Sequence, residues 1–113
     1  MLATQNRLKR DREFKNVFSK GKGVFDAACG IKFKKNDLDF SRFAVVVGIK
    51  VHKSAVKRNR VRRQYQEVIR LRLEEVKAGY DVVLLCGKGA LELDYEKKEK
   101  NLLKVLKKAE LLV

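Results

Sequence analysis

Several residue types are missing or scarce in this sequence, and the scarcity of cysteine and histidine and the lack of long apolar runs each exclude a class of protein. The 113 residues include no proline, no tryptophan, one methionine, one histidine and two cysteines. Because Cys29 and Cys86 form no CxxC pair and His52 is the single histidine, the ligands of a structural zinc site are lacking. No apolar run approaches the roughly 20 residues of a membrane helix, and no apolar signal segment is visible near the start. We therefore expect free thiols, a cytoplasmic location and no membrane partner.

Basic residues, by contrast, are abundant. Lysine and arginine number 28 against 14 aspartates and glutamates, which gives a net charge of +14. Hydrophobic residues make up 45% of the chain, enough for a packed core and too many for a basic disordered tail. The length suits one domain, residues 1–113. Such a domain is expected to bind a polyanion, most commonly a nucleic acid, rather than a small-molecule substrate.

The excess charge is confined to the first 72 residues. Residues 1–23 carry a net charge of +5, and residues 53–72 carry eight basic residues against one acidic residue, a net charge of +7. Residues 73–113 hold eight of each sign and are neutral. A chain that is basic only for solubility spreads its charge more evenly. The pattern therefore predicts a basic side and a balanced side.

Hydrophobic periodicity predicts a short helix near the start of the chain. Asp11 is a candidate cap for a helix from Arg12 to about Ser19. Phe14, Val17 and Phe18 fall on one face of this helix, at the spacing i, i+3, i+4. The glycines that follow are expected to end it.

Alternating apolar and polar positions predict strands in the middle of the chain. One strand-like stretch covers residues 24–35, and a turn separates it from a stronger one over residues 40–51. The second stretch places five apolar residues on one face: Phe43, Val45, Val47, Ile49 and Val51. Its other face is small or apolar in the middle, which is typical of a strand covered on both sides.

The second half of the chain predicts a long helix, a buried strand and a final helix. Ser54 is the candidate N-cap of a helix running to about Lys77. Its apolar side gathers six residues: Val61, Tyr65, Val68, Ile69, Leu73 and Val76. A buried strand follows over residues 80–86, and Asp94 is a candidate cap for a helix to about Leu111.

This order of elements predicts the α+β class. Helices are expected to lie on a mainly antiparallel sheet in a two-layer sandwich. The strand–helix–strand stretch from Phe43 to Cys86 is a candidate crossover unit with one parallel pair.

The densest basic segment lies at the start of the long helix. Six cations fall within the eleven residues from Lys53 to Arg63. At a helix N-terminus, backbone N–H groups and the helix dipole also favour phosphate. Arginine grips phosphate in a bidentate manner and stacks on unpaired bases. A solvated helix face is the plainer reading, but Glu67 alone interrupts the run, so i,i+4 ion pairs do not account for it.

A family resemblance enters at these residues. Arg58-Asn59-Arg60, preceded by Ala55-Val56 and followed by Val61-Arg62-Arg63, resembles the arginine–asparagine–arginine motif of the bacterial ribonuclease P protein subunit. Further in-order similarity covers most of the chain, in the segments Asn6-Arg7-Leu8-Lys9, Glu13 to Gly21, Leu38 to Val47 and Tyr80 to Leu85. The sequence departs from the family's usual residues at two positions: Lys53, where glycine is common, and Gln66, where arginine is common.

The resemblance implies a fold and a function. The fold would be a four-stranded sheet with three helices, in the order α-β-β-β-α-β-α, with a left-handed β-α-β crossover. The protein would bind the ribonuclease P RNA and the 5′ leader of precursor tRNA. It would assist removal of that leader as a non-catalytic subunit, because the RNA carries the chemistry and binds most of the Mg²⁺ that activates water. Apart from the RNA it would be monomeric.

Two sets of contact residues follow from the basic segment and the resemblance together. The RNA-subunit-binding set comprises Lys53, Ser54, Ala55, Lys57, Arg58, Asn59, Arg60, Arg62, Arg63 and Arg70. The leader-binding set comprises Arg7, Lys9, Arg10, Phe14, Phe18, Ile31, Lys32 and Phe33. Unpaired bases stack on aromatic rings while nearby cations follow the backbone, although two phenylalanines at i, i+4 are also typical of an ordinary core.

No catalytic or metal-ligating residues are predicted. The nearest acidic pairs fall in a turn or at helix ends, where solvation or capping explains them: Asp37 with Asp39, Glu74 with Glu75, and Asp94 with Glu96. Three alternatives remain: a ribosomal-type structural RNA-binding protein or RNA chaperone, a DNA-binding helix module, and an autonomous nuclease. The absent acid–base constellation disfavours the nuclease, and the central strands disfavour a short two-helix DNA reader.

Overall fold

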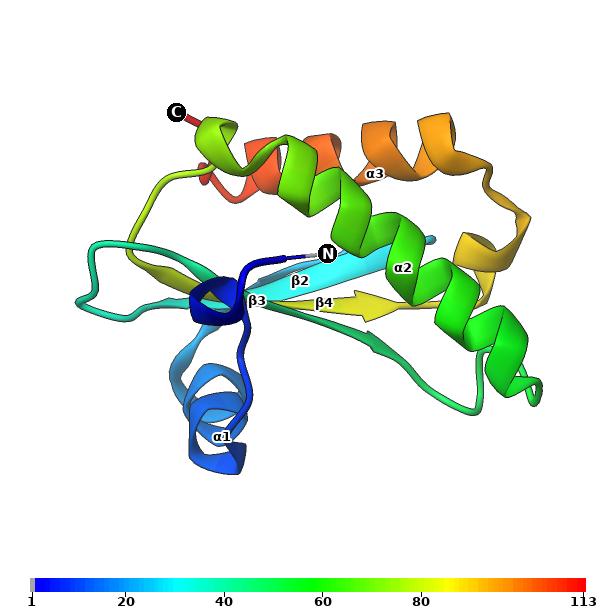
Figure 1. Ribbon diagram of the computed structural model, residues 1–113, viewed down its shortest axis with the longest axis horizontal. Helices are drawn as coiled ribbons and strands as arrows, with labels where there is room; N and C mark the ends of the chain where they lie inside the picture. Colours follow the sequence, from blue (N-terminus) through cyan, green and yellow to red (C-terminus); the bar gives the residue numbers. More distant parts are fainter. Residues whose placement is uncertain (1) are drawn as a thin grey trace.

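A four-stranded sheet separates two unequal layers of helix in the computed structural model, which describes residues 2–113 (Figure 1). The helices are α1 (Asp11–Lys20), α2 (Ala55–Leu71) and α3 (Tyr95–Lys108). The strands are β1 (Lys22–Val24), β2 (Cys29–Lys35), β3 (Arg42–Val47) and β4 (Tyr80–Cys86). Single 3₁₀ turns lie at Thr4–Asn6, Leu73–Glu75 and Lys88–Glu92. The predicted order α-β-β-β-α-β-α and the α+β class are confirmed.

The sheet is mixed, with the strand order β1-β2-β4-β3. β2 pairs antiparallel with both β1 and β4, whereas β3 pairs parallel with β4. α2 joins the two parallel strands, which confirms the predicted crossover unit. "Mainly antiparallel" therefore holds for two of the three pairs, and the left-handed sense of the crossover stays a prediction.

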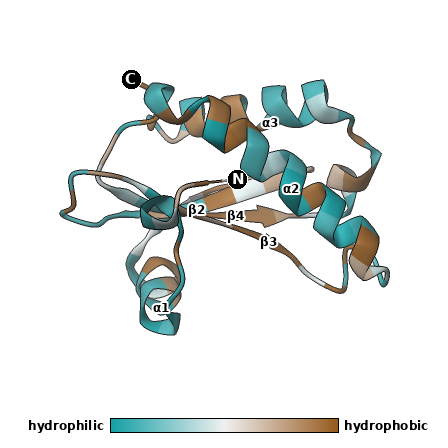
Figure 2. Cartoon of the chain, viewed as in Figure 1, coloured by the Kyte–Doolittle hydropathy of each residue, from teal (hydrophilic) through white to brown (hydrophobic). Residues whose placement is uncertain are grey.

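The main core lies between the sheet and the pair α2 and α3, which cover the same face (Figures 1 and 2). α2 contributes four buried side chains at helical spacing: Val61, Tyr65, Val68 and Ile69. Each such burial stabilises the fold by about 1.5–3 kcal/mol. The predicted apolar side of this helix is therefore confirmed over its helical part.

A small polar network ties the layers of the main core together. The Asn101 Oδ1 atom accepts hydrogen bonds from the Tyr65 hydroxyl at 2.9 Å and from the Cys29 thiol at 2.8 Å. Burial raises the pKa of Tyr65 and raises that of Cys29 to about 12, so both groups stay protonated donors at neutral pH. Both cysteines are free, as predicted, and Cys29 is buried.

α1 packs on the opposite face of the sheet and covers only part of it (Figure 1). Its Val17 is buried against Leu8 and Val83, with Phe14 partly buried beside them. The two-layer description therefore applies to the sheet with α2 and α3, and α1 adds a partial third layer. No other helix of the described chain covers this face of the sheet.

Several predicted boundaries are wrong. α1 begins at Asp11, with Arg10 as its N-cap residue, because the Glu13 carboxylate accepts the backbone N–H groups of Lys9 and Arg10 at 3.1 Å each. β3 ends at Val47, so Ile49 is 71% exposed rather than part of a buried face.

The C-terminal boundaries also differ. α2 ends at Leu71 rather than near Lys77, because a 3₁₀ turn leads Val76 into an isolated bridge with Leu112. α3 ends at Lys108, and Leu111 beyond it is buried in the core. Within the described residues, no helix has both the length and the apolar character needed to cross a membrane.

Candidate nucleic-acid interface

The start of α2 is held in place by its own side chains. The Ser54 hydroxyl accepts the Lys57 N–H at 3.4 Å, which confirms the predicted cap, and His52 Nδ1 accepts the Ser54 N–H at 2.9 Å. The Arg58 guanidinium donates to the carbonyls of His52 and Lys53, at 2.9 Å each. Arg58 therefore fixes the loop before the helix instead of reaching outward.

Three cations around this fixed loop point into solvent. Lys53, Lys57 and Arg60 are exposed, and among the described residues none of their side chains has a hydrogen-bond or ion-pair partner. The first N–H groups of α2 lie beside them, so helix dipole and side-chain charge favour an anion at the same place. This end of the helix therefore carries positive charge that the described residues do not neutralise.

Further along α2 the predicted contact residues bond to one another. Asn59 Oδ1 accepts from Arg62 at 2.6 Å, and the Asn59 carbonyl accepts from Arg63 at 3.3 Å. Arg70 is paired with Glu67 at 2.5 Å. Asn59 and Arg63 are exposed and Arg62 is half-buried, so these side chains form one polar strip. Within it Asn59 orients the guanidinium of Arg62.

A cavity of about 370 Å³ opens beside the same helix end, between α2 and the start of α3. His52, Lys57 and Arg60 line it together with two residues that sequence analysis did not single out, Gln64 and Lys98. Lys98 is 2% exposed and donates to the Leu93 carbonyl, and burial lowers the pKa of its ammonium. The Gln64 Oε1 atom is buried and has no hydrogen-bond partner within residues 2–113. No periodicity or motif signals this buried lysine.

The N-terminal cations of the leader-binding set are brought together in one groove. This groove, of about 350 Å³, is lined by Arg7, Lys9 and Arg10 and by two further arginines, Arg12 and Arg42. Glu13 is its single acidic residue. Arg7 is partly committed, because its Nε donates to the Leu2 carbonyl at 2.9 Å.

The two phenylalanines of α1 have different environments. Phe14 is partly buried against the sheet, whereas Phe18 is 41% exposed. The Lys32 ammonium lies 5.7 Å from the centre of the Phe18 ring, a cation–π distance, and donates to the Phe18 carbonyl at 3.4 Å. Phe14 thus anchors the helix, and Phe18 with Lys32 offers a ring and a charge to solvent.

One cleft brings the neighbourhoods of the two predicted surfaces together. It has a volume of about 230 Å³ and lies at the outer strand β3, between Phe14 of α1 and Gln66 of α2. Ala44 and the 38%-exposed Val46 form its floor on β3. The cleft is therefore lined by residues of both helices and lies next to both predicted surfaces.

Two residues of the leader-binding set face the wrong side of the sheet. Ile31 is fully buried in the main core, so it cannot contact RNA. Phe33 shares its face and packs edge-on against Tyr80, with ring centres 6.4 Å apart. Lys32 alone of the predicted triplet points toward α1, because side chains alternate along a strand.

An exposed aromatic residue on the α1 side was missed. Phe25 is 61% exposed and lies over two glycines. A Cβ atom at Gly30 would come within 2.5 Å of its ring, and one at Gly23 within 2.8 Å. Both positions must lack a side chain for the ring to lie there. An aromatic residue between two glycines of pairing strands was the signal available in the sequence.

The acidic residues do not form a metal site. Among residues 2–113 no three His, Cys, Asp or Glu side chains lie together. The most buried carboxylate, Asp81, is bound by Arg42 at 2.7 and 2.8 Å and by Asn36 at 2.9 Å. Both oxygens of the Asp81 carboxylate are therefore occupied by protein donors.

Fold and surface together define a small α+β protein with a preformed basic face for a polyanion. Comparison with known proteins specifies the class. The ribonuclease P family model matches residues 2–110. The ribonuclease P protein component of Fusobacterium nucleatum is 34% identical, over 95% of this chain and 99% of the relative. That of Clostridioides difficile is 41% identical, over 86% and 88%. This chain belongs to the ribonuclease P protein family, which confirms the predicted resemblance.

Solved structures agree with this assignment. The RNase P protein from Thermotoga maritima in complex with 1-(4-fluorophenyl)-2-thiourea aligns with a TM-score of 0.83 at 31% identity, over 89% of this chain and 97% of that one. The Staphylococcus aureus RNase P protein aligns with a TM-score of 0.87 over 96% and 98%. At 22% identity, the second likeness supports the fold alone.

Proposed function

We propose that this chain, as a protein component of ribonuclease P, holds the RNA subunit with the N-terminal half of α2 and the 5′ leader of precursor tRNA with the α1 side of the sheet. The carrying observation is the start of α2. There a capped helix end coincides with three cations whose side chains have no partner among residues 2–113. The matched relatives favour this role over a ribosomal-type structural protein or an RNA chaperone.

The α2 surface suits a folded RNA. Arg58 and Ser54 fix the backbone of the loop, so the backbone that carries these cations loses little entropy on binding. Lys57, Arg60 and Arg63 can each neutralise a phosphate, which releases counterions and makes the affinity depend strongly on salt.

The α1 side suits a single strand. The groove of Arg7, Lys9 and Arg10 supplies charge, and Phe18 with Lys32 supplies a stacking ring beside a cation. Bases of any sequence stack on such rings, so leader binding would be only weakly sequence-dependent. Phe25, exposed on the same side of the sheet, offers a further ring.

The chemistry belongs to the RNA subunit in this proposal. Hydrolysis of one phosphodiester bond would use Mg²⁺ held mainly by RNA oxygens, with the metal activating the attacking water. The protein would bind and orient the RNA subunit and the leader, and would neutralise part of their phosphate charge. We propose that it acts in the cytoplasm as one copy per RNA subunit.

Reconstitution tests the proposal directly. This chain is mixed with a bacterial ribonuclease P RNA and precursor tRNA at low, near-physiological magnesium, and release of the leader is followed over time. We expect the chain to stimulate leader removal severalfold and to cut nothing without the RNA. A lack of stimulation by this chain, or cleavage by the protein alone, would contradict the proposal.

The leader surface is tested by Phe18→Leu. The change keeps an apolar side chain and removes the ring, and stacking on one ring contributes about 1–3 kcal/mol. We expect leader-containing precursor tRNA to bind roughly tenfold more weakly, with RNA-subunit affinity unchanged. Binding of mature tRNA, which has no leader, is the matched control. An equal loss for both tRNAs would remove Phe18 from the leader surface.

A further inference from the structure

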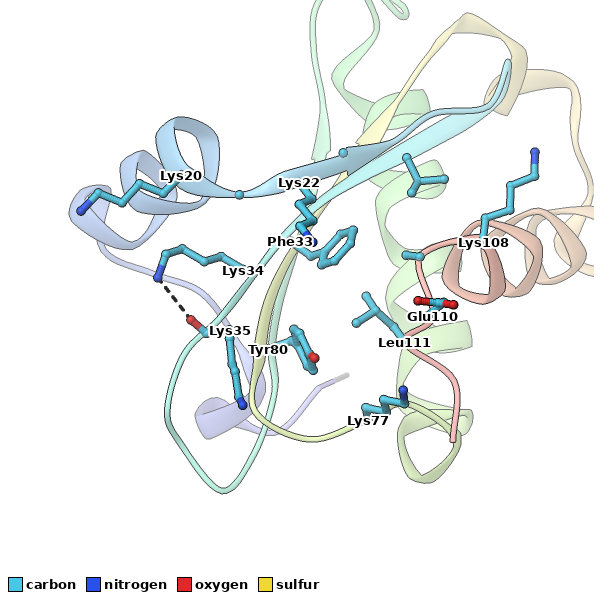
Figure 3. A pocket seen from close by; sticks show the side chains of 14 residues that line it. Lys20, Lys22, Phe33, Lys34, Lys35, Lys77, Tyr80, Lys108, Glu110 and Leu111 are labelled. Carbon is cyan, nitrogen blue, oxygen red and sulfur yellow. Dashed lines mark hydrogen bonds between the residues drawn. The ribbon is translucent and has the colours of Figure 1, made fainter.

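A further cavity lies apart from the cavity beside α2 and from the groove of the N-terminal arginines. It has a volume of about 550 Å³ and opens where the ends of β1 and β2 meet the end of α3 (Figure 3). Its floor is apolar and aromatic, made by Phe33, Tyr80 and Leu111. Phe33 and Tyr80 are only partly buried, so their rings line the opening.

Six lysines surround this floor, against one acidic residue, Glu110. They come from the end of α1, from β1, from β2, from the loop before β4 and from the end of α3: Lys20, Lys22, Lys34, Lys35, Lys77 and Lys108. Among the described residues none of them forms an ion pair. Like charges gathered around one cavity repel one another, so a polyanion bound there would neutralise a repulsion that is already present.

The walls of the cavity are fixed by the backbone. The Lys77 N–H donates to the Leu111 carbonyl at 2.7 Å, and the Lys77 carbonyl accepts from Ser41 at 2.7 Å. On the other side, a Cβ atom at Gly21 would come within 2.4 Å of the Val17 carbonyl oxygen and 2.7 Å of that of Phe33. The chain can therefore make this junction only with glycine, and the site is formed before any ligand arrives.

We propose that this cavity is a third RNA site, which takes a short single-stranded segment. Its phosphates would lie on the lysine rim, and one base would lie against Phe33 and Tyr80. Lysine is a compact point charge that follows a phosphate backbone without reading bases, and an aromatic floor under a basic rim is the arrangement that binds single strands. A convex duplex cannot place a base on a concave floor.

The experiment uses the purified chain with octauridylate as the probe, and binding is measured by fluorescence anisotropy over a range of salt. The triple variant Lys35→Ala/Lys77→Ala/Lys108→Ala is compared with a control triple of equal charge change, Lys97→Ala/Lys100→Ala/Lys107→Ala. The control lysines are exposed on α3 and line none of the cavities described above. Thermal unfolding of each variant shows that it is folded.

We expect the cavity triple to lower the slope of log K against log salt by about 2, at about 0.7 for each phosphate that is no longer neutralised. The control triple should change it by about 0.5 or less. The NMR ring resonances of Phe33 and Tyr80 should shift when octauridylate binds. Phe33→Leu should weaken the binding of octauridylate severalfold and leave the binding of pyrophosphate unchanged.

Three results would overturn the proposal. Equal slopes for the two triples would mean that net charge alone matters. Pyrophosphate binding as tightly as octauridylate, with the same ring shifts, would indicate a small-anion pocket. Octaglutamate binding as tightly would indicate an acidic peptide. Because the measurement uses the chain alone, its failure is distinct from a failure of leader removal in the holoenzyme.

Discussion

The triple variant Lys57→Ala/Arg60→Ala/Arg63→Ala is expected to bind the ribonuclease P RNA on the order of a hundredfold more weakly. Each of the three phosphate interactions contributes about 1 kcal/mol, and 3 kcal/mol corresponds to roughly two powers of ten in Kd. The slope of log K against log salt should fall by about 3, one unit for each phosphate. Filter binding of labelled RNA across a salt series measures both quantities.

The α3 triple Lys97→Ala/Lys100→Ala/Lys107→Ala is the matched control, because it removes the same charge from exposed positions. Its slope should change by less than one unit. The α2 variant should keep its stability, since in the part of the chain that the structure describes these three side chains make one hydrogen bond, that of Arg63 to the Asn59 carbonyl at 3.3 Å. Equal losses in the two triples would show that the basic segment acts through net charge and would remove α2 from the RNA-subunit surface.

Arg58 shows how far the motif alone could predict the site. The sequence places Arg58 and Arg60 in one basic run, and a repeated charge pattern makes no distinction between them. In the structure Arg58 donates to the His52 and Lys53 carbonyls, whereas Arg60 has no partner among the described residues. The difference arises from the path of the loop before α2, and local periodicity contains no information about that path.

The strands illustrate the same limit. Alternation along β2 separates Ile31 and Phe33 from Lys32, and this much the sequence predicts. Which of the two faces α1 covers depends on packing between segments far apart in the chain. The prediction that all three residues contact the leader was therefore wrong for Ile31, which is buried, and Phe33 lies on the same face of the sheet as Ile31. The long helix was predicted well because its buried stripe of Val61, Tyr65 and Val68 repeats over several turns.

The cavity lined by six lysines could not be predicted from the sequence, for a related reason. Residues 73–113 are neutral in sum, so the last third of the chain gave no sign of a basic surface. Lys77 and Lys108 nevertheless line the same cavity as Lys22 and Lys35. The bridge between Val76 and Leu112 holds the end of the chain beside the segment that leads into β4. The net charge of a segment counts residues that are close in the sequence, whereas a polyanion binds to charges that are close together in the folded protein.

Arg42→Met is expected to cause the largest loss of stability, about 3 kcal/mol. Arg42 grips Asp81 with two hydrogen bonds, at 2.7 and 2.8 Å, and reaches Glu13 of α1 at 2.6 Å. The Asp81 side chain is 6% exposed. Without Arg42 this carboxylate is a buried charge that keeps only Asn36 as a donor, and breaking such pairs costs about 3–5 kcal/mol. Thermal unfolding should show a Tm lowered by more than about 10 °C.

A double-mutant cycle separates the ion pair from the loss of packing. Asp81→Asn removes the charge that Arg42 leaves behind, so Arg42→Met/Asp81→Asn should be less destabilised than the sum of the two single variants. If the effects add, the loss comes from the packing of the arginine stem, and the pair itself contributes little. Arg42→Lys keeps the charge but cannot bridge two carboxylates in the same geometry, so it should fall between the wild type and Arg42→Met.

The pH dependence of stability tests the role of Arg42 independently. Burial of Glu13 acts to raise its pKa, but the backbone N–H groups of Arg10 and Lys9 and the charge of Arg42 outweigh it, and the pKa is lowered overall. Glu13 therefore adds stability above its unfolded pKa of about 4.3, and this stability is lost as the pH falls through the lower folded value. Arg42→Met removes one of the causes of the lowering. The free energy gap between variant and wild type should thus shrink as the pH falls below the unfolded pKa of Glu13, and a gap that widens on acidification would contradict the role assigned to Arg42.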